Sequence, residues 1–310
     1  MMRRVLVPLD GSALAESIIR DARRLAGADG TLVLVRDASR PASDLNRGIA
    51  AGPLTVSDCE AYLETMARLL REEGVLVEVH TTFLNDISLA IDAASELFDV
   101  DMIACSTHGR SVMGRLVHGG AAWQALAGSK VPVLLRHGDG QSITGFADLP
   151  TRRIMVPLDG SEYAEKALPL AQELALEWGA QLVLVRVMTI TGSLGAPSVD
   201  YYAVKYESEI AEGRDYLKAL AATLQGEAQT KTFVGAVVDR LAEVVDAMEI
   251  TDVVIASHGR TGLSRVILGS VADSLIHKVH VPIIVIPALA TTPREGHVER
   301  EETRPVPLHV

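Results

Sequence analysis

The chain has 310 residues, 48% of them hydrophobic and only 4% aromatic, with a formal net charge of −11 at pH 7. This length favours two domains, and an aliphatic core suits parallel sheets covered by helices on both faces. The acidic charge disfavours nucleic acid and anionic membranes as partners, and no apolar run reaches the roughly 18 residues of a membrane span. Cys59 and Cys105 form no CxxC pair, so we expect a cytoplasmic protein without disulfides.

Four blocks of sequence occur twice, in the same order and at a spacing of 149 or 150 residues. They are RVLVPLDGS (4–12) with RIMVPLDGS (153–161), LVLVR (32–36 and 182–186), THGRSVMGRLVHGG (107–120) with SHGRTGLSRVILGS (257–270), and KVPVLLR (130–136) with HVPIIVI (280–286). Such self-similarity indicates a tandem repeat. We assign copy one to 1–138, a linker to 139–151, copy two to 152–288 and a flexible C-terminal tail to 289–310.

The second copy predicts strands and helices that alternate along the chain. Strands are expected at 153–158, 181–187, 229–234, 252–256 and 282–286, and helices from about 161 to 178, 201 to 224, 238 to 248 and 270 to 277. This βαβαβαβαβ order indicates a doubly wound parallel sheet with right-handed crossovers. Ligands bind such sheets at the carboxyl ends of the strands, where the strand order reverses.

The stretch from Ser257 to Ser270 follows a strand and opens a helix, which suits a phosphate site. Gly269 and Ser270 offer backbone amides, a hydroxyl and the positive end of a helix dipole. Arg260 and Arg265 can neutralise phosphate charge. Because GxxxxGK[ST] is absent from the sequence, this is not a P-loop.

Asp159 ends the first strand of copy two, and two interpretations stay open for it: a hydrogen-bond partner of a ribose, or the turn residue of an Asp-Gly pair. Ser161 and its counterpart Ser12 are expected as helix N-caps, because neither lies in a GxSxG context. No carboxylate or second histidine has metal-ligand spacing beside His108 or His258, so neither a metal site nor a catalytic residue is expected.

VPLDGS after the first strand, SHGRTGLSRVILGS after the fourth and VPIIVIP at the end resemble the universal stress protein family. The resemblance covers about residues 1–136 and 152–287. It implies, in each copy, a Rossmann-like five-stranded sheet of the adenine nucleotide alpha hydrolase-like type with strand order 3-2-1-4-5. It also implies a stress-response role with a bound adenine nucleotide, usually ATP, with Mg²⁺ as an optional companion.

In copy two, the resemblance implies that Pro157 and Asp159 flank the adenosine and that the Val187 backbone meets the adenine. Two segments would wrap the phosphates. They are Ala256, Ser257, His258, Gly259, Arg260, Thr261 and Gly262, and then Gly269, Ser270, Val271 and Ala272. The family's signature is Gly, two residues, Gly, nine residues, and Gly-Ser or Gly-Thr. Its first glycine is Ala256 here, which narrows the room beside the ligand.

Copy one departs further from the family's pattern. The positions that correspond to the site are Pro8, Asp10, Asp37, Ser106, Gly109, Gly119 and Gly120. Gly120 lacks the closing hydroxyl, Asp37 brings a carboxylate close to the expected adenine, and Val112 replaces Gly262. We therefore expect weaker binding or a different ligand in copy one, and the better nucleotide site in copy two.

The function that these observations favour is a non-enzymatic, nucleotide-binding stress protein. Two alternatives stay open: a weak ATP-hydrolysing or nucleotidyl-transferring enzyme, and a nucleotide-free module that dimerises through its last strands. Those strands, VPVLLR and VPIIVI, are apolar and suited to edge pairing. We expect them to join the two copies as a pseudo-dimer within the chain, with a homodimer of chains left open.

Overall fold

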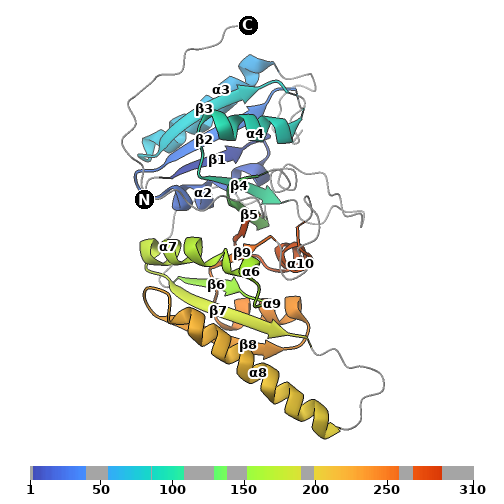
Figure 1. Ribbon diagram of the computed structural model, residues 1–310. Helices are drawn as coiled ribbons and strands as arrows, with labels where there is room; N and C mark the ends of the chain where they lie inside the picture. Colours follow the sequence, from blue (N-terminus) through green and yellow to red (C-terminus); the bar gives the residue numbers. More distant parts are fainter. Residues whose placement is uncertain are drawn as a thin grey trace.

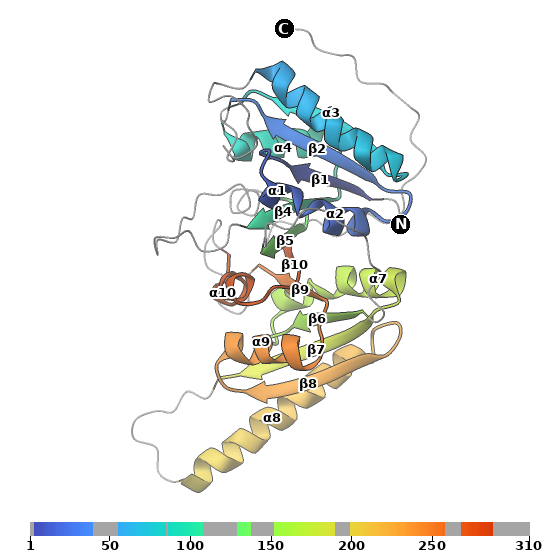
Figure 2. The ribbon, with the colours of Figure 1, turned by 180° about the vertical axis from the view of Figure 1, so that it is seen from behind.

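The computed structural model describes residues 3–39, 55–84, 86–107, 129–137, 152–189, 199–257 and 268–287. They form one ten-stranded sheet with helices on both of its faces (Figures 1 and 2). The expected linker at 139–151 and tail at 289–310 lie outside the described residues.

Copy one supplies the upper half of the molecule in Figure 1. Its strands are β1 (Arg4–Pro8), β2 (Thr31–Asp37), β3 (Leu76–Thr82), β4 (Met102–Thr107) and β5 (Val133–His137). Its helices in the described residues are α1 (Ala13–Glu16), α2 (Ile19–Ala26), α3 (Val56–Glu72) and α4 (Ile87–Leu97).

Copy two supplies the lower half and repeats the pattern of copy one. Its strands are β6 (Arg153–Pro157), β7 (Gln181–Met188), β8 (Ala228–Val234), β9 (Asp252–Ala256) and β10 (Ile283–Ile286). Its helices are α6 (Glu162–Glu165), α7 (Leu168–Trp178), α8 (Val199–Ala221), α9 (Val237–Ala247) and α10 (Ser270–Lys278). The predicted alternation of strands and helices is confirmed.

The strand order across the whole sheet is β3-β2-β1-β4-β5-β10-β9-β6-β7-β8. Each copy therefore has the expected order 3-2-1-4-5, and all pairings within a copy are parallel. The copies join where β5 and β10 run antiparallel, with Leu134 opposite Ile284. This confirms the prediction that the last strands pair within the chain as a pseudo-dimer.

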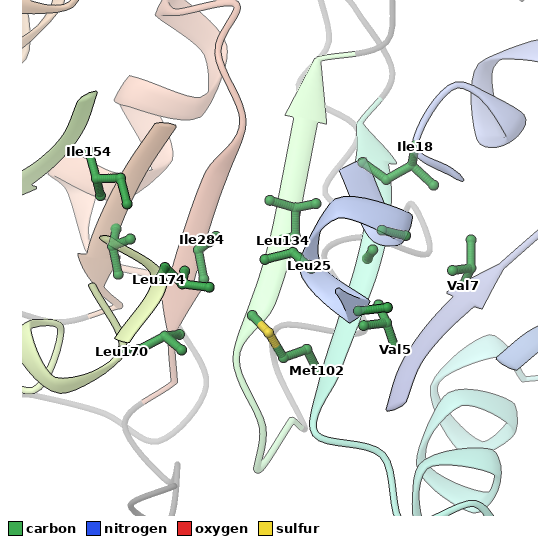
Figure 3. Packing of buried hydrophobic residues seen from close by; sticks show 14 of the residues in the cluster. Val5, Val7, Ile18, Leu25, Met102, Leu134, Ile154, Leu170, Leu174 and Ile284 are labelled. Atoms are coloured by element: carbon green, nitrogen blue, oxygen red, sulfur yellow. The ribbon is translucent and has the colours of Figure 1, made fainter. Parts of the chain in front are cut away.

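Period-two alternation along the strands divides the core into two layers. Val5 and Leu32 belong to a cluster on the face covered by α2, α3, α7 and α8, whereas Leu6 and Val33 face α4, α9 and α10. The first cluster runs through both copies, because its members include residues of β5 and β10. Figure 3 shows Leu134 and Ile284 on these neighbouring strands. Burial of aliphatic side chains therefore stabilises the join as well as each copy.

The prediction of a single helix from about 161 to 178 is wrong in one respect. The structure has two separate helices there, α6 and α7. In one continuous helix the N–H of residue 169 would donate to the Glu165 carbonyl, and Pro169 has no N–H. Pro169 lies in the first turn of α7, where an N–H would have no partner within the helix. Copy one has the same break between α1 and α2, although Arg20 occupies the corresponding position. The break therefore belongs to the fold, and Pro169 is compatible with it.

Candidate functional site

The carboxyl ends of β6 and β9 meet at the point where the strand order of copy two reverses. The two strands are parallel neighbours, with Met155 opposite Val253. The chain leaves β6 toward α6 and leaves β9 toward α10, so the two connections start at the same edge of the sheet. This is the position at which doubly wound sheets bind ligands.

The start of α10 is the feature of this edge that best suits an anion. Gly269 is the N-cap residue, and as a glycine it has no side chain with which to cap the helix. The Gly269 N–H donates to the Ser257 carbonyl at 2.6 Å, which fixes the start of α10 against the end of β9. The first N–H groups of a helix have no acceptor within the helix. Those of α10 therefore face this edge as free donors, together with the positive end of the helix dipole.

Asp159 forms a turn at the end of β6. Its Oδ1 accepts from the Ser161 backbone N–H at 3.0 Å and from the Ser161 hydroxyl at 2.6 Å. Gly160 between them has φ +88°, a left-handed conformation that favours glycine. Ser161 in turn accepts from the Ala164 N–H and caps α6, as predicted. The structure therefore contains the turn that one interpretation of Asp159 predicted, and Asp159 Oδ1 is the carboxylate oxygen that forms it.

Three side chains that the sequence reasoning missed support this turn. The Arg186 guanidinium lies 4.9 Å from the centre of the Tyr216 ring, and the Tyr216 hydroxyl donates to Glu165 at 2.9 Å. A Cβ added to Gly160 would lie 3.2 Å from both terminal nitrogens of Arg186. Burial and the neighbouring Glu165 raise the pKa of Tyr216, so the phenol keeps its proton and acts as a donor.

Copy one repeats this support around Gly11, which has φ +86°. Arg36 lies 4.7 Å from the centre of the Tyr62 ring, and the Tyr62 hydroxyl donates to Glu16 at 3.0 Å. The signal in the sequence was the arginine at the end of both LVLVR blocks. The repeat marked these positions, but it did not reveal that the side chains pack under the turns.

The structure brings nine of the predicted copy-two residues to one edge of the sheet. They are Pro157, Asp159, Val187, Ala256, Ser257, Gly269, Ser270, Val271 and Ala272. The other five, His258 to Gly262, lie outside the described residues. In copy one, Pro8, Asp10, Asp37 and Ser106 take the corresponding places at strand ends, whereas Gly109, Gly119 and Gly120 are outside the described part.

Ser12 caps a helix, and Cys59 and Cys105 are buried in the core. Ser12 accepts from the Ala15 N–H and caps α1, as expected. Cys59 and Cys105 are buried, and burial raises the pKa of both thiols, that of Cys105 to about 12. In the same part of the chain, no cluster of three or more His, Cys, Asp or Glu side chains is placed to hold a metal ion. Nor does any helix described there have the length and apolarity to cross a membrane.

Together the fold and the strand-end site define a tandem of two doubly wound α/β domains, the second of which places the N-terminus of α10 at its switch point. The chain belongs to the universal stress protein family, whose model matches it twice, at residues 1–137 and 150–287. The two matches correspond to the two halves of the ten-stranded sheet.

Proteins of this family resemble the chain over most of its length. A universal stress protein of Mycobacterium tuberculosis is 28% identical over 215 residues, which cover 67% of this chain and 68% of the relative. One of Mycolicibacterium smegmatis is 26% identical over 298 residues, covering 91% and 96%. The crystal structure of a universal stress protein from Archaeoglobus fulgidus has a TM-score of 0.60 at 21% identity, covering 92% of this chain and 96% of that one.

Proposed function

We propose that this universal stress protein binds an adenine nucleotide, ATP above all, in copy two and acts without catalysing a reaction. The observation that carries the proposal is the start of α10 beside the end of β9, where the N-cap residue is Gly269, which has no side chain of its own to cap the helix. Backbone amides at a helix N-terminus suit phosphate oxygens, since they supply both donors and a favourable dipole. A nucleotide bound there would shift the conformation or the partner choice of the tandem.

The neighbouring turn supports a site for the sugar. Asp159 is held at the end of β6 by Ser161 and lies at the same edge of the sheet as Ala256. Ser161 fixes the orientation of this carboxylate, and a carboxylate is the kind of acceptor that a ribose hydroxyl can donate to. Pro157, Val187, Ser257 and the segment 258–262 complete the proposed lining, with Ser270 to Ala272 at the phosphates.

Three observations favour binding over catalysis. Ser161 is used as a cap, so its hydroxyl is engaged by the Ala164 amide. Burial raises the pKa of Cys105 and Cys59, which removes the thiolate that a nucleophile needs. The phenol of Tyr216 keeps its proton, since burial and Glu165 raise its pKa. Slow ATP hydrolysis is the alternative that a single-turnover assay separates from this proposal.

The experiment is a calorimetric titration of ATP into the wild-type chain and the Gly269→Val variant. Gly269 has φ −60° and ψ 146°, which valine can adopt, so the variant should fold. The added side chain covers the helix start, and we expect at least a tenfold loss of affinity for the copy-two site. Unchanged ATP affinity and stoichiometry in a folded variant would overturn the proposal. No binding to the wild-type chain would favour a nucleotide-free module.

A further inference from the structure

A closed ring of contacts joins the turn after β6 to α8. Arg186 on β7 packs against Gly160 of the turn and lies 4.9 Å from the centre of the Tyr216 ring on α8. The Tyr216 hydroxyl donates to Glu165 of α6 at 2.9 Å, and α6 is capped by Ser161 of the turn itself. The turn, β7, α8 and α6 therefore support one another, and Tyr216 is the side chain by which α8 takes part.

α8 comes close to β7 just before Tyr216. Gly213 is buried in the middle of the helix, where glycine is less favourable than alanine by about 1 kcal/mol. A Cβ at Gly213 would lie 3.2 Å from Met188 Sδ, 3.3 Å from Thr232 Cγ2 and 3.4 Å from Arg186 Cδ. The glycine therefore lets α8 pack on Arg186, and in a close-packed interior a shift of one side chain moves its neighbour.

The N-terminal part of α8 lies outside the body of copy two. Figures 1 and 2 show it projecting past the ends of β7 and β8. Between 207 and 212 every side chain is exposed or half-buried, and the buried positions begin with Gly213 and Leu217. The contacts that place α8 on the sheet therefore begin at the same part of the helix that meets the ring.

Copy one contains the same ring in a more closed form. Arg36 is 4% exposed and Glu16 is 7% exposed, whereas their counterparts in copy two are half-buried. Cys59 takes the place of Gly213, three residues before the tyrosine of the ring, and is completely buried. The second helix of copy one also has 17 residues instead of 23. Copy two therefore has the ring with more exposed members and the longer helix attached to it.

We propose that Arg186 and Tyr216 are positioning residues that couple nucleotide binding in copy two to the position of α8. A nucleotide whose ribose donates to Asp159 holds the turn, the turn holds Arg186, and Arg186 holds Tyr216. Coupling of this kind is reciprocal, so whatever fixes α8 also strengthens nucleotide binding. The inference rests on the proposed function, and it names α8 as the element whose change a partner can detect.

The experiment measures hydrogen–deuterium exchange of the full chain, both free and saturated with ATP. The amides of residues 209–217 should exchange at least about fivefold more slowly in the ATP complex, which is the lower end of typical coupling between sites. Tyr216→Leu removes the ring and its hydroxyl but keeps a side chain that favours helix. At saturating ATP this variant should lose the protection of α8, and it should bind ATP at least about fivefold more weakly.

Two further variants separate the contacts of the ring. Arg186→Met removes the guanidinium on which Tyr216 stacks and should give the same loss of protection, so the result does not depend on one variant. Tyr216→Phe keeps the ring on Arg186 and loses only the hydrogen bond to Glu165, so it should retain part of the protection.

Tyr62→Leu is the matched control, because it makes the same change in the ring of copy one. It should destabilise the chain at least as much as Tyr216→Leu in thermal unfolding, since Arg36 and Glu16 are more deeply buried than their counterparts. ATP should nevertheless protect α8 in this variant as it does in the wild type. The amides of α9, on the other face of the sheet, are the internal reference in every sample.

Unchanged exchange of α8 in the ATP complex would overturn the inference, and so would full protection in both Tyr216→Leu and Arg186→Met, while the proposed function would stand. Loss of the protection in Tyr62→Leu would also overturn it, because general destabilisation would then be the cause. A wild-type chain that binds no ATP would overturn the proposed function and the coupling together.

Discussion

Arg24 of copy one and Asp252 of copy two form an ion pair across the join between the copies. Arg24 Nη1 donates to Asp252 Oδ2 at 3.3 Å, and Nη2 donates to Oδ1. The Asp252 side chain is completely buried, and Thr251 also donates to it at 2.9 Å. The Arg24 guanidinium lies 4.7 Å from the centre of the Trp178 ring of α7, so one side chain contacts two elements of the other copy.

This pair makes the two copies unequal partners. The repeat aligns Arg24 with Glu173 and Asp252 with Met102, at spacings of 149 and 150 residues. Two second copies paired in the same way would therefore place a glutamate opposite the buried Asp252. Arg3 adds to the asymmetry, because it donates to Glu173 at 2.5 Å and to Glu177 at 2.6 Å. The charges at the join favour pairing within the chain.

The first prediction concerns Arg24→Met, which leaves Asp252 buried without its cation. Breaking a buried pair in this way costs about 3–5 kcal/mol. Burial already raises the pKa of Asp252, and Arg24 opposes that effect, so its removal raises the pKa further. A carboxyl group with a raised folded pKa is destabilising above that pKa and regains stability as the pH falls through it. Urea unfolding should show that the variant's free energy of unfolding falls further below that of the wild type at about pH 7.5 than at about pH 5.

The double variant with Met at both Arg24 and Asp252 is the control for this prediction. Replacing a whole buried pair by apolar side chains is often neutral or stabilising, so the double variant should lie within about 1 kcal/mol of the wild type. A deficit that is independent of pH, or a double variant as unstable as Arg24→Met, would show that the buried charge is not the cause.

The second prediction compares two glycines that both have positive φ. Gly160 has φ +88° beside Arg186, whereas Gly179 has φ +61° at the end of α7 with open space around it. Alanine at either position should lower the free energy of unfolding by about 1 kcal/mol, because a residue with a Cβ is strained at positive φ. Only Gly160→Ala also pushes on Arg186 and the Asp159 turn, so only that variant should weaken ATP binding. Equal ATP affinities for the two variants in calorimetry would contradict a role for the turn.

The third prediction concerns the two thiols. Cys59 and Cys105 are buried, and burial raises the pKa of each, so little thiolate exists at about pH 8. A thiol reagent that gives a coloured product should modify neither cysteine in the folded chain and both in denaturant. Rapid labelling of either cysteine under native conditions would mean that its thiol is accessible and ionised, which would reopen a redox or nucleophilic role.

The repeated blocks were enough to predict the order of elements, because each block ends a strand or caps a helix and so marks the topology directly. VPVLLR and VPIIVI also predicted the pairing of β5 with β10, since both strands are apolar edges. The ion pair between Arg24 and Asp252 could not be predicted, because the two residues are 228 positions apart and differ between the copies. The partners of Arg186 were hidden for a similar reason, since Tyr216 is brought to it only by the packing of α8.

The measurement that tests nucleotide binding by copy two most directly is a calorimetric titration of ATP into the Gly269→Val and Gly119→Val variants, followed in parallel by thermal unfolding. We expect Gly269→Val to lose the tighter ATP site while Gly119→Val retains it, with both variants folded. Equal losses would mean that the two copies share the task. Full ATP affinity in Gly269→Val would contradict an anion site at the start of α10.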